Sequence, residues 1–544
     1  MAINFPKNPA SGSSFTDTAS GQSYIWDGVS WVSDGTVTGG SGGGGGGTII
    51  AGVERIIAGT GVIVSPASGT GLVTVAASIS GDSVSGGALQ PGVYLITDPI
   101  FGGENSSSGW SDAFNHALQQ TLASGSYYNG TIKRLVVPAG VFTCKKAIER
   151  TQPVKISGQG QTATKINMGT SAPVTRSVDG TTSRGQFFLQ NKGSIQDVRI
   201  TGTCDIGGPS SIVVAMRRYD NDGIAFGSGV VGADGQNDSA DMDTAFIQVA
   251  FGANGGGGGG DTDGLIKFVG RNAFISNCSF NTNGTAIHLT FPNKPGSESA
   301  GDSCSNDSLS NPNQGGVFGW RRCMVNGCWF HLTDNAKMVV VSGKYQLNNL
   351  VLTNNQADIG GRLLTVIPQS AQGGNYNNGV GGGLNKAVIN GNNCNNQTGN
   401  NQYIDFQGGG QYDAVTISGN AFGGHDDSYL VGGCPSISAV KRCKHAVKVH
   451  SSATVNGLSI NGNSFANFTQ ASVLLEGTNN GVCITGNTIL NSSIENSDAA
   501  IKADVGTTGV VVGNTLVRTI SGATSSFVSA SGMTASANVF VNNT

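Results

Sequence analysis

The stretch Ile389-Asn390-Gly391-Asn392-Asn393-Cys394 carries a six-residue pattern that recurs through the second half of the chain. The pattern reads aliphatic, any residue, Gly or Asn, polar, any residue, apolar, and it first occurs at Ile275–Phe280. Other copies, some of them weaker, begin at Val325, Leu352, Ile417, Ile460, Ile484, Val511 and Ala535. From Asn392 onwards its fourth position recurs after 28, 43, 24, 27 and 24 residues, ending at Asn538. This repeat is the strongest structural signal in the chain.

A spacing in the twenties predicts one coil of a parallel β-solenoid, because it is too short for a pair of helices. Val, Ile, Thr and Phe alternate with polar residues around each copy, as short strands require. We interpret the Asn as a turn residue that tolerates a left-handed backbone, and its stacked copies as a ladder of amide hydrogen bonds. The intervals of 43, and of 50 between Cys278 and Cys328, indicate inserted loops or a degenerate copy. The sequence therefore predicts an all-β solenoid over residues 131–544.

The composition agrees with a many-turned β-structure. The 544 residues include 86 glycines, and only 12% of the chain is charged. This length exceeds what one ordinary globular core accommodates, so we expect several modules or a solenoid. A net charge of -3 and the lack of a basic, aromatic stripe give no reason to expect nucleic acid binding. No long apolar run predicts a membrane span, and residues 1–9 lack the features of a secretory signal.

The ten cysteines are too sparse for a disulfide scaffold. Cys278 and Cys328 occupy the pattern position that Asn takes in later copies, so we predict buried free thiols there. Cys434 and Cys443 could pair across a loop. No Cys or His spacing matches a metal site, and we predict neither a metal nor a cofactor.

Residues 1–35 form a predicted module of their own, in which Asp27-Gly28 is a favoured hairpin turn. So short a segment buries too little surface to be stable alone. We therefore expect it to dock on a larger body or on another copy of itself, although its aromatic residues could also pack only on each other. The predicted docking residues are aromatic: Phe5, Tyr24, Trp26 and Trp31.

Three further segments precede the solenoid. Residues 36–48 contain a run of glycines and are predicted to be a flexible linker. Residues 49–80 contain short strands separated by glycine turns, a small β or stalk module that we expect oligomerisation to stabilise. Residues 81–130 contain a predicted helix at Ser107–Leu122 whose face of Ala113, Phe114, Ala117 and Leu118 is apolar. We interpret this last segment as the cap on the N-terminal end of the solenoid.

A helix followed by Val137-Pro-Ala-Gly-Val-Phe142 and Ile156-Ser-Gly-Gln-Gly160 resembles the start of the pectate-lyase-like right-handed β-helix of phage tail fibres and tailspikes. Residues 1–35 and Ile56–Val75 are also similar to virion structural proteins of tailed phages, particularly those that infect cyanobacteria. The resemblance implies a right-handed β-helix, a homotrimer and a place in the virion tail after assembly in the host cytoplasm. It also implies that residues 1–35 dock on a tail adaptor, nozzle or baseplate protein.

This fold family includes lyases, hydrolases and plain binders, so the fold does not assign an activity. Glycan cleavage needs a pair of carboxylates, or a base together with Arg or a cation. Glu is scarce, and the densest acidic region lies between residues 220 and 263. Its weak catalytic candidates are Asp220, Asp222, Asp241 and Asp243. The same aspartates could bind calcium or simply lie in solvated turns.

Loops inserted into a solenoid commonly build its binding surface, and aromatic rings stack on sugars. The predicted glycan-binding residues lie in or beside such loops, and they are Arg217, Tyr219, Trp320, Tyr412, His425, Asp426, Asp427 and Tyr429. Tyr403 has a similar setting, whereas Trp329 lies on a strand and could belong to the core. The basic run Lys441–His445, continuing to Lys448 and His450, could face an anionic polysaccharide or only solvent.

The leading hypothesis is host recognition, in which the β-helix binds a cell-surface polysaccharide reversibly and three linked copies raise the avidity. The first alternative is a depolymerase, a lyase or a glycosidase, on the same scaffold. The scarcity of Glu and the lack of a recognisable acid–base pattern favour binding over cleavage. The second alternative is a purely structural virion spacer.

Overall fold

The chain divides into two units, Met1–Ala88 and Leu89–Thr544, in the computed structural model. The structure describes residues 10, 12–16, 22–26, 31–37, 62–65, 74–77, 93–119, 134–150, 154–169, 171–178, 181–190, 193–202, 210–216, 244–253, 264–269, 273–291, 321–332, 336–343, 346–359, 361–368, 381–397, 402–424, 443–493, 498–519 and 526–543.

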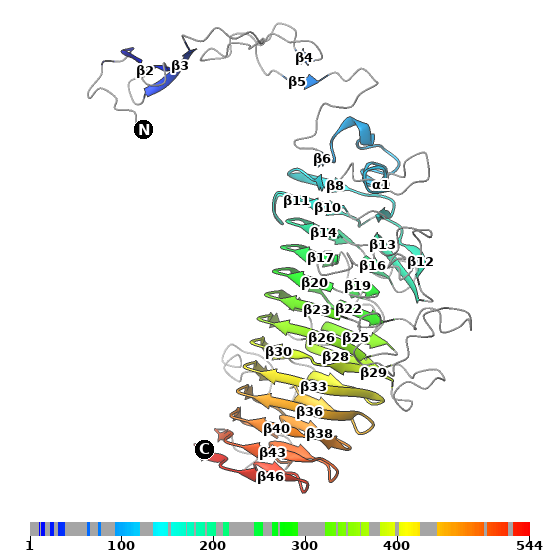
Figure 1. The fold of residues 1–544 in the computed structure, drawn as a ribbon, viewed down its shortest axis with the longest axis vertical. Coiled ribbons are helices and arrows are strands. Elements are labelled where there is room, and N and C mark those ends of the chain that lie inside the picture. The colour runs from blue at the N-terminus through cyan, green and yellow to red at the C-terminus, as the bar shows by residue number, and fades with distance from the viewer. Residues whose placement is uncertain are drawn as a thin grey trace, which may run out of the picture. The chain divides into compact units, whose positions relative to one another are not determined.

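The second unit is a parallel β-helix built from three long sheets, here called sheets I, II and III (Figure 1). One coil contributes a strand to each sheet in turn. For example, β22 (Thr285–Phe291) lies in sheet III, β23 (Arg321–Asn326) in sheet I and β24 (Trp329–Leu332) in sheet II. The chain then returns to sheet III as β25 (Lys337–Gly343), which pairs in parallel with β22. The predicted all-β parallel solenoid is confirmed.

Sheet I runs from the N-terminal end of the β-helix to its last coil (Figure 1). Its strands are β6 (Val93–Leu95), β7 (Arg134–Val136), β10 (Lys155–Ser157), β14 (Gly193–Gln196), β17 (Thr244–Ile247), β20 (Ala273–Ser276), β23, β26 (Gln346–Thr353), β29 (Gly381–Asn385), β30 (Val388–Asn390), β33 (Gly410–Ser418), β36 (Thr454–Asn461), β39 (Asn479–Asn480), β40 (Val482–Thr485), β43 (Gly509–Val512) and β46 (Met533–Ser536).

Sheet II follows sheet I in every coil after a sharp bend. Its strands are β8 (Gly140–Thr143), β11 (Thr164–Asn167), β15 (Arg199–Gly202), β18 (Ala250–Ala253), β21 (Ser279–Thr282), β24, β27 (Gln356–Ile359), β31 (Asn393–Gln397), β34 (Ala421–Gly424), β37 (Ser464–Ala466), β41 (Thr488–Leu490), β44 (Thr515–Arg518) and β47 (Val539–Asn542).

Sheet III closes each coil. Its strands are β9 (Ile148–Arg150), β12 (Val174–Val178), β13 (Thr181–Gln190), β16 (Ser211–Met216), β19 (Gly264–Val269), β22, β25, β28 (Arg362–Pro368), β32 (Gln402–Phe406), β35 (His445–Val449), β38 (Val473–Leu475), β42 (Ile501–Ala503) and β45 (Val528–Ser529). Its strands pair in parallel except that β12 and β13 form an antiparallel hairpin.

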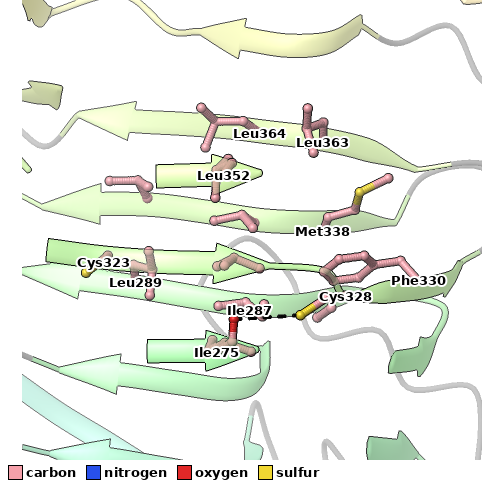
Figure 2. Close-up of a cluster of buried hydrophobic side chains, with 14 of the residues drawn as sticks. Ile275, Ile287, Leu289, Cys323, Cys328, Phe330, Met338, Leu352, Leu363 and Leu364 are labelled. Carbon is pink, nitrogen blue, oxygen red and sulfur yellow. Dashed lines mark hydrogen bonds between the residues drawn. The ribbon is translucent and has the colours of Figure 1, made fainter. Parts of the chain in front are cut away.

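The core consists of side chains that stack along the axis, coil upon coil. The first pattern position is fully buried in successive coils, as at Ile275 and Leu352. The sixth position does the same, and the Phe280 and Phe330 rings stack with their centroids 4.9 Å apart. Figure 2 shows Ile275, Leu352 and Phe330 among the side chains that fill this interior. Burial of these apolar rows is the main source of cohesion between coils.

The fourth pattern position forms the predicted ladder of asparagines. The side-chain Nδ2 of Asn392 donates to Oδ1 of Asn420 over 2.8 Å, and Asn420 donates in the same way to Asn463 over 2.9 Å. The rungs are Asn355, Asn392, Asn420, Asn463, Asn487, Asn514 and Asn538. Each Nδ2 also reaches a backbone carbonyl, such as that of Ile389 from Asn420. Amide groups can therefore be buried here without losing their hydrogen bonds.

The left-handed backbone position precedes the ladder residue, and the prediction that placed it at the ladder Asn is wrong. Gly391 has a φ of 65° and Gly419 a φ of 61°, whereas the ladder asparagines that follow them do not have positive φ. In the copy at Leu352 the residue with positive φ is Asn354, and Asn355 is the rung. The two positions have different roles, because the first turns the chain and the second bonds to the next coil.

The earlier coils carry cysteines at the ladder position, as predicted. Cys278 and Cys328 are free thiols that are each 1% exposed. Burial is the main cause of a pKa of the Cys278 thiol well above its ordinary value. Cys443 is a buried thiol whose Sγ donates to the carbonyl of His445 over 3.3 Å, and Cys434 lies outside the described residues.

The capping helix, α1 (Ser111–Gln119), begins later than the predicted Ser107. The preceding residues form a tight turn instead, in which Oδ1 of Asn105 accepts hydrogen bonds from the backbone of Ser107 and Ser108. The predicted apolar face is confirmed, since its four residues are buried in the core. A single-turn helix, η1 (Pro99–Phe101), packs beside it through Phe101. Neither helical segment among the described residues has the length and apolar character that crossing a membrane requires.

The first unit contains two small antiparallel sheets. Strands β1 (Ser14–Thr16), β2 (Gln22–Trp26) and β3 (Trp31–Val37) form one, and Trp26 lies opposite Trp31 as the predicted hairpin requires. Strands β4 (Val62–Ser65) and β5 (Thr74–Ala77) form the other. Phe5 lies outside the described residues.

Candidate functional site

Most of the predicted site residues lie outside the part of the chain that the structure describes. These residues are Arg217, Tyr219, Asp220, Asp222, Asp241, Asp243, Trp320, His425, Asp426, Asp427 and Tyr429. Their roles therefore stay predictions.

Tyr412 is described, and its predicted role in glycan binding is wrong. It lies within the long strand β33, at 0% exposure, and its ring stacks on Phe406 with centroids 4.6 Å apart. Its hydroxyl donates a hydrogen bond of 2.9 Å to the carbonyl of Gln407, and burial raises its pKa well above the ordinary value. Tyr403 is a second buried core aromatic, bonded to the carbonyl of Gly423. Tyr412 points inward because it alternates along β33 with Gln411 and Asp413, whereas Tyr403 is buried together with its neighbour Ile404 at the start of β32.

A cluster of charged side chains gathers instead around Asp405 of β32, in sheet III. Ile404 and Phe406 of β32 face the core, so the intervening Asp405 points away from it. Arg362 approaches Asp405 from the preceding coil, and His450 approaches from the following one. Lys337 lies one coil before Arg362, directly beside it in register. We call Lys337, Arg362, Asp405 and His450 the Asp405 cluster.

Asp405 is the centre of this cluster. Its Oδ1 lies 2.8 Å from Nε2 of His450, and its Oδ2 lies 3.3 Å from Nη1 of Arg362 and 3.2 Å from Nε2 of Gln407. Burial to 1% exposure pushes the pKa of this carboxyl upward. Hydrogen bonds from His450, Gln402 and Gln407 outweigh burial, and the pKa ends below its usual value. Asp405 is therefore ionised at neutral pH.

Lys337 is the titratable cation of the cluster. The pKa of its amine is lowered to about 8. Burial is the main cause, the neighbouring charge of Arg362 acts in the same direction, and Asp405 opposes both. An appreciable fraction of the amine is consequently uncharged in weakly alkaline solution. The same amine can act as a cation or, once deprotonated, as a base.

Two more groups extend the charged face by one coil. Lys448 lies beside Asp405 in register and contacts Glu476, with 3.4 Å between Nζ and Oε1. His445 takes no part in this face: its Nδ1 lies 2.7 Å from the carbonyl of Ala471, and burial lowers its pKa to about 4. His445 is therefore neutral at pH 7 and belongs to the packing.

The cluster holds two cations, Lys337 and Arg362, against one carboxylate, and part of it reaches solvent. The side chain of Arg362 is 19% exposed and that of His450 is 33% exposed, around a carboxylate that is almost fully covered. Such an arrangement can bind an anion or transfer a proton. No group of three or more His, Cys, Asp or Glu side chains among the described residues is placed to hold a metal ion.

Part of the charged face around Asp405 was recognisable in the sequence. Lys448 and His450 belong to the basic run that was considered for anionic polysaccharide. Arg362 and Asp405 were missed because they are 43 residues apart, and residues 369–380 interrupt the period between them. Counting residues from the clean copies, coil by coil, is the step that would have aligned them.

Trp329 is a second exposed feature, and the interpretation of this residue as core is wrong. It is 47% exposed on β24, between Cys328 and Phe330, which are buried. Alternation along the strand therefore places the indole on the outer face of sheet II. The pattern itself contained this information, because Trp329 occupies its fifth position and the fourth and sixth point inward.

No protein-family model matches the chain, and no curated protein matches it. Solved structures do resemble it. Tailspike protein 3 of bacteriophage CBA120 is 14% identical, with a TM-score of 0.37 over 82% of this chain and 57% of the tailspike. The catalytic domain of a GH87 α-1,3-glucanase is 12% identical, with a TM-score of 0.39 over 86% of this chain and 72% of that domain. Gene product 12 of bacteriophage phi29 is 12% identical, with a TM-score of 0.39 over 81% of this chain and 55% of that protein.

Proposed function

We propose that the chain is a subunit of a phage tail fibre or tailspike that binds an anionic polysaccharide on the host surface through the outer face of sheet III. The resemblance of its sequence to tail-fibre proteins and the confirmed β-helix support this proposal. The observation that carries it is the Asp405 cluster. In a chain with only 12% charged residues, four ionisable side chains meet there, one from each of four adjacent coils.

The chemistry of the cluster favours a negatively charged sugar. A guanidinium binds a carboxylate or sulfate through two parallel hydrogen bonds, and Lys337 adds a second cation on the preceding coil. Asp405 contacts both Arg362 and His450, and its single negative charge offsets only part of the charge of Arg362 and Lys337. An anionic polymer is thus attracted, whereas a polycation is repelled.

The geometry of the fold favours a polymer. Adjacent strands of sheet III lie about 4.8 Å apart, so equivalent positions repeat along the axis at this spacing. A polysaccharide lying along the axis would contact Arg362 and, two coils further on, Lys448 and His450, whose side chains are 19%, 20% and 33% exposed. Weak contacts to single sugars then add up, and a homotrimer would increase the avidity further.

The N-terminal unit supports the virion half of the proposal. Tyr24 and Trp26 lie on β2 of a three-stranded sheet that is too small to be stable alone, and both are partly exposed. We infer that this sheet docks on a tail adaptor, nozzle or baseplate protein of the virion.

The test uses the full chain and surface polysaccharide from candidate hosts, with alginate as a defined polyuronate and dextran as the uncharged control. We expect saturable binding of an anionic polymer that weakens with added salt. Arg362→Gln should lower the affinity about tenfold, because one charge-assisted pair is lost. Arg199→Gln, a matched change on sheet II, should leave the affinity unchanged. Binding that is insensitive to salt and to Arg362→Gln would overturn the assignment of the site.

The cluster also favours one alternative, a lyase that cleaves the same polymer. A Lys337 amine with a pKa of about 8 can accept a proton while Arg362 neutralises the sugar carboxylate. Following polymer length in the binding experiment separates the two functions. Shortening that Lys337→Met abolishes would establish cleavage, whereas binding at constant length establishes an adhesin. If polysaccharide from a host that the phage infects is neither bound nor shortened, the spacer alternative is favoured.

A further inference from the structure

We propose that Trp329 is the stacking platform of a second saccharide-binding site, on the outer face of sheet II, that takes an uncharged sugar unit. This inference rests on the proposed polysaccharide-binding function and adds a subsite to it. The Asp405 cluster belongs to sheet III, so the two sites use different faces of the same coils.

The backbone and the core hold Trp329 in its outward position. The amide of Trp329 donates to the carbonyl of Cys278 over 2.9 Å, and the amide of Gln356 donates to the carbonyl of Cys328 over 2.9 Å. The neighbouring Phe330 stacks on Phe280 at an interplanar angle of 11°. A shift of β24 by one residue would move the indole into the core, and it would move the buried neighbours Cys328 and Phe330 into water. The indole is consequently fixed at the surface before any ligand arrives.

The surroundings of the indole suit the hydroxyl groups of a sugar. Ser279 and Gln356 are its register partners on the two adjacent coils. The His331 ring lies two residues along the strand, with its centroid 6.3 Å from that of the indole and the planes inclined at 55°. Asn281 lies beside His331 in register and is exposed on β21, between Phe280 and Thr282, which are buried. A flat aromatic ring bordered by amide, hydroxyl and imidazole groups provides both an apolar face and hydrogen-bonding partners for a pyranose.

Polar side chains continue from Trp329 along the outer face of sheet II, as binding of an extended glycan requires. Gln356 pairs in register with Asn393 of the following coil, and both side chains are exposed. A saccharide that stacks on Trp329 and runs along the axis would meet these amides at steps of about 4.8 Å.

The same surface suits a second copy of the chain less well. A stable protein interface buries about 800 Å² on each side and is apolar at its centre. Here one large apolar side chain stands among small and polar ones: Ser279, Asn281, Gln356 and Asn393. The oligomeric state of the variants nevertheless enters the test, because an exposed tryptophan is also a common interface residue.

The experiment titrates the full chain with uncharged hexasaccharides (cellohexaose, maltohexaose and chitohexaose), using calorimetry and indole fluorescence. We expect at least one of them to bind in a manner that does not depend on salt. Trp329→Ala should weaken that binding about tenfold, whereas Trp329→Phe, which keeps a flat ring, should weaken it much less. Val388→Ala removes a similarly exposed apolar side chain from sheet I and should have no effect.

Three outcomes would overturn the inference. The first is that none of these uncharged probes binds, and the second is equal affinity of Trp329→Ala and the unaltered chain. The third is a Trp329→Ala chain whose oligomeric state changes while its saccharide binding does not, which would assign the indole to a subunit interface. Titration of the same samples with the anionic polymers separates this inference from the proposed function. Salt-sensitive binding of the anionic polymers depends on Arg362 and can persist when the Trp329 site is lost. If this salt-sensitive binding is absent, the proposed function alone is contradicted.

Discussion

Asn420 shows how one residue joins two coils. It is 1% exposed, it donates to Oδ1 of Asn463 over 2.9 Å, and its own Oδ1 accepts from the backbone amide and the side chain of Asn392. Asn420→Ala would remove these bonds and leave buried partners without replacements. We expect the free energy of unfolding to fall by about 2 kcal/mol or more, seen as a lower midpoint in urea. Asn393→Ala removes an exposed amide nearby and should leave the midpoint almost unchanged.

The glycines of the coils differ in what they tolerate. Gly462 has a φ of 60°, and a Cβ there would meet nothing within 4 Å. Gly509 has a φ of 146°, and its Cβ would lie 1.9 Å from the carbonyl oxygen of Val482. Gly462→Ala should therefore cost only the strain of a left-handed alanine, about 1–2 kcal/mol, and Gly462→Asn less. Gly509→Ala should cost more than either, because the backbone of β43 must move. Equal losses in thermal denaturation would contradict this steric explanation.

At the scale of elements, strands β25, β28 and β32 bring charges together, and this lowers the free energy of unfolding by an amount that depends on pH. Lys337 has a folded-state pKa of about 8, below the ordinary value of 10.5. The folded state therefore disfavours the charged amine, and the chain loses stability wherever Lys337 must be charged, below about pH 8. The loss diminishes as the pH rises from about 8 towards 10.5.

Lys337→Met tests this cost. The variant should unfold at a higher urea concentration than the unaltered chain at pH 6, and the difference should shrink towards pH 10. Lys155→Met, on β10 of sheet I, is the matched control. A constant difference across this range would mean that packing of the methionine, and not the charge of the amine, stabilises the variant.

The elements also show how much of the fold and of the site could be predicted from the sequence. The coil at Ile460–Asn463 was predictable because aliphatic, glycine and asparagine positions each have a separate physical role there. The helix begins at Ser111 and not at the predicted Ser107, because Oδ1 of Asn105 accepts from the backbone of Ser107 and Ser108 and closes a turn there. The Asp405 cluster could not be predicted from local pattern, since its members meet only after the intervening insertions have been looped out. Tyr412 was misjudged because a loop-like composition around Gly408–Gly410 hid the long strand that follows.

At the scale of the whole molecule, stability is distributed along the stack, because each coil contacts only its neighbours. Phe465 lies between coils, at 0% exposure, and stacks on Phe422 with centroids 5.9 Å apart. Phe540 lies on β47, which pairs with only one strand of sheet II, and it is 42% exposed. The same residue type thus has two environments in one sheet.

This contrast predicts where the β-helix opens. Backbone amides of Val539–Asn542 should exchange with deuterium faster than those of Ser464–Ala466, because opening the last strand breaks one set of inter-strand bonds and exposes little core. Phe465→Ala should cost about 3–5 kcal/mol and accelerate exchange in the adjacent coils. Phe540→Ala should cost far less and affect only β44 and β47. Uniform exchange along sheet II, or equal effects of the two variants, would mean that the stack unfolds as one cooperative body, in which case a ligand bound at any coil would stabilise all of them equally.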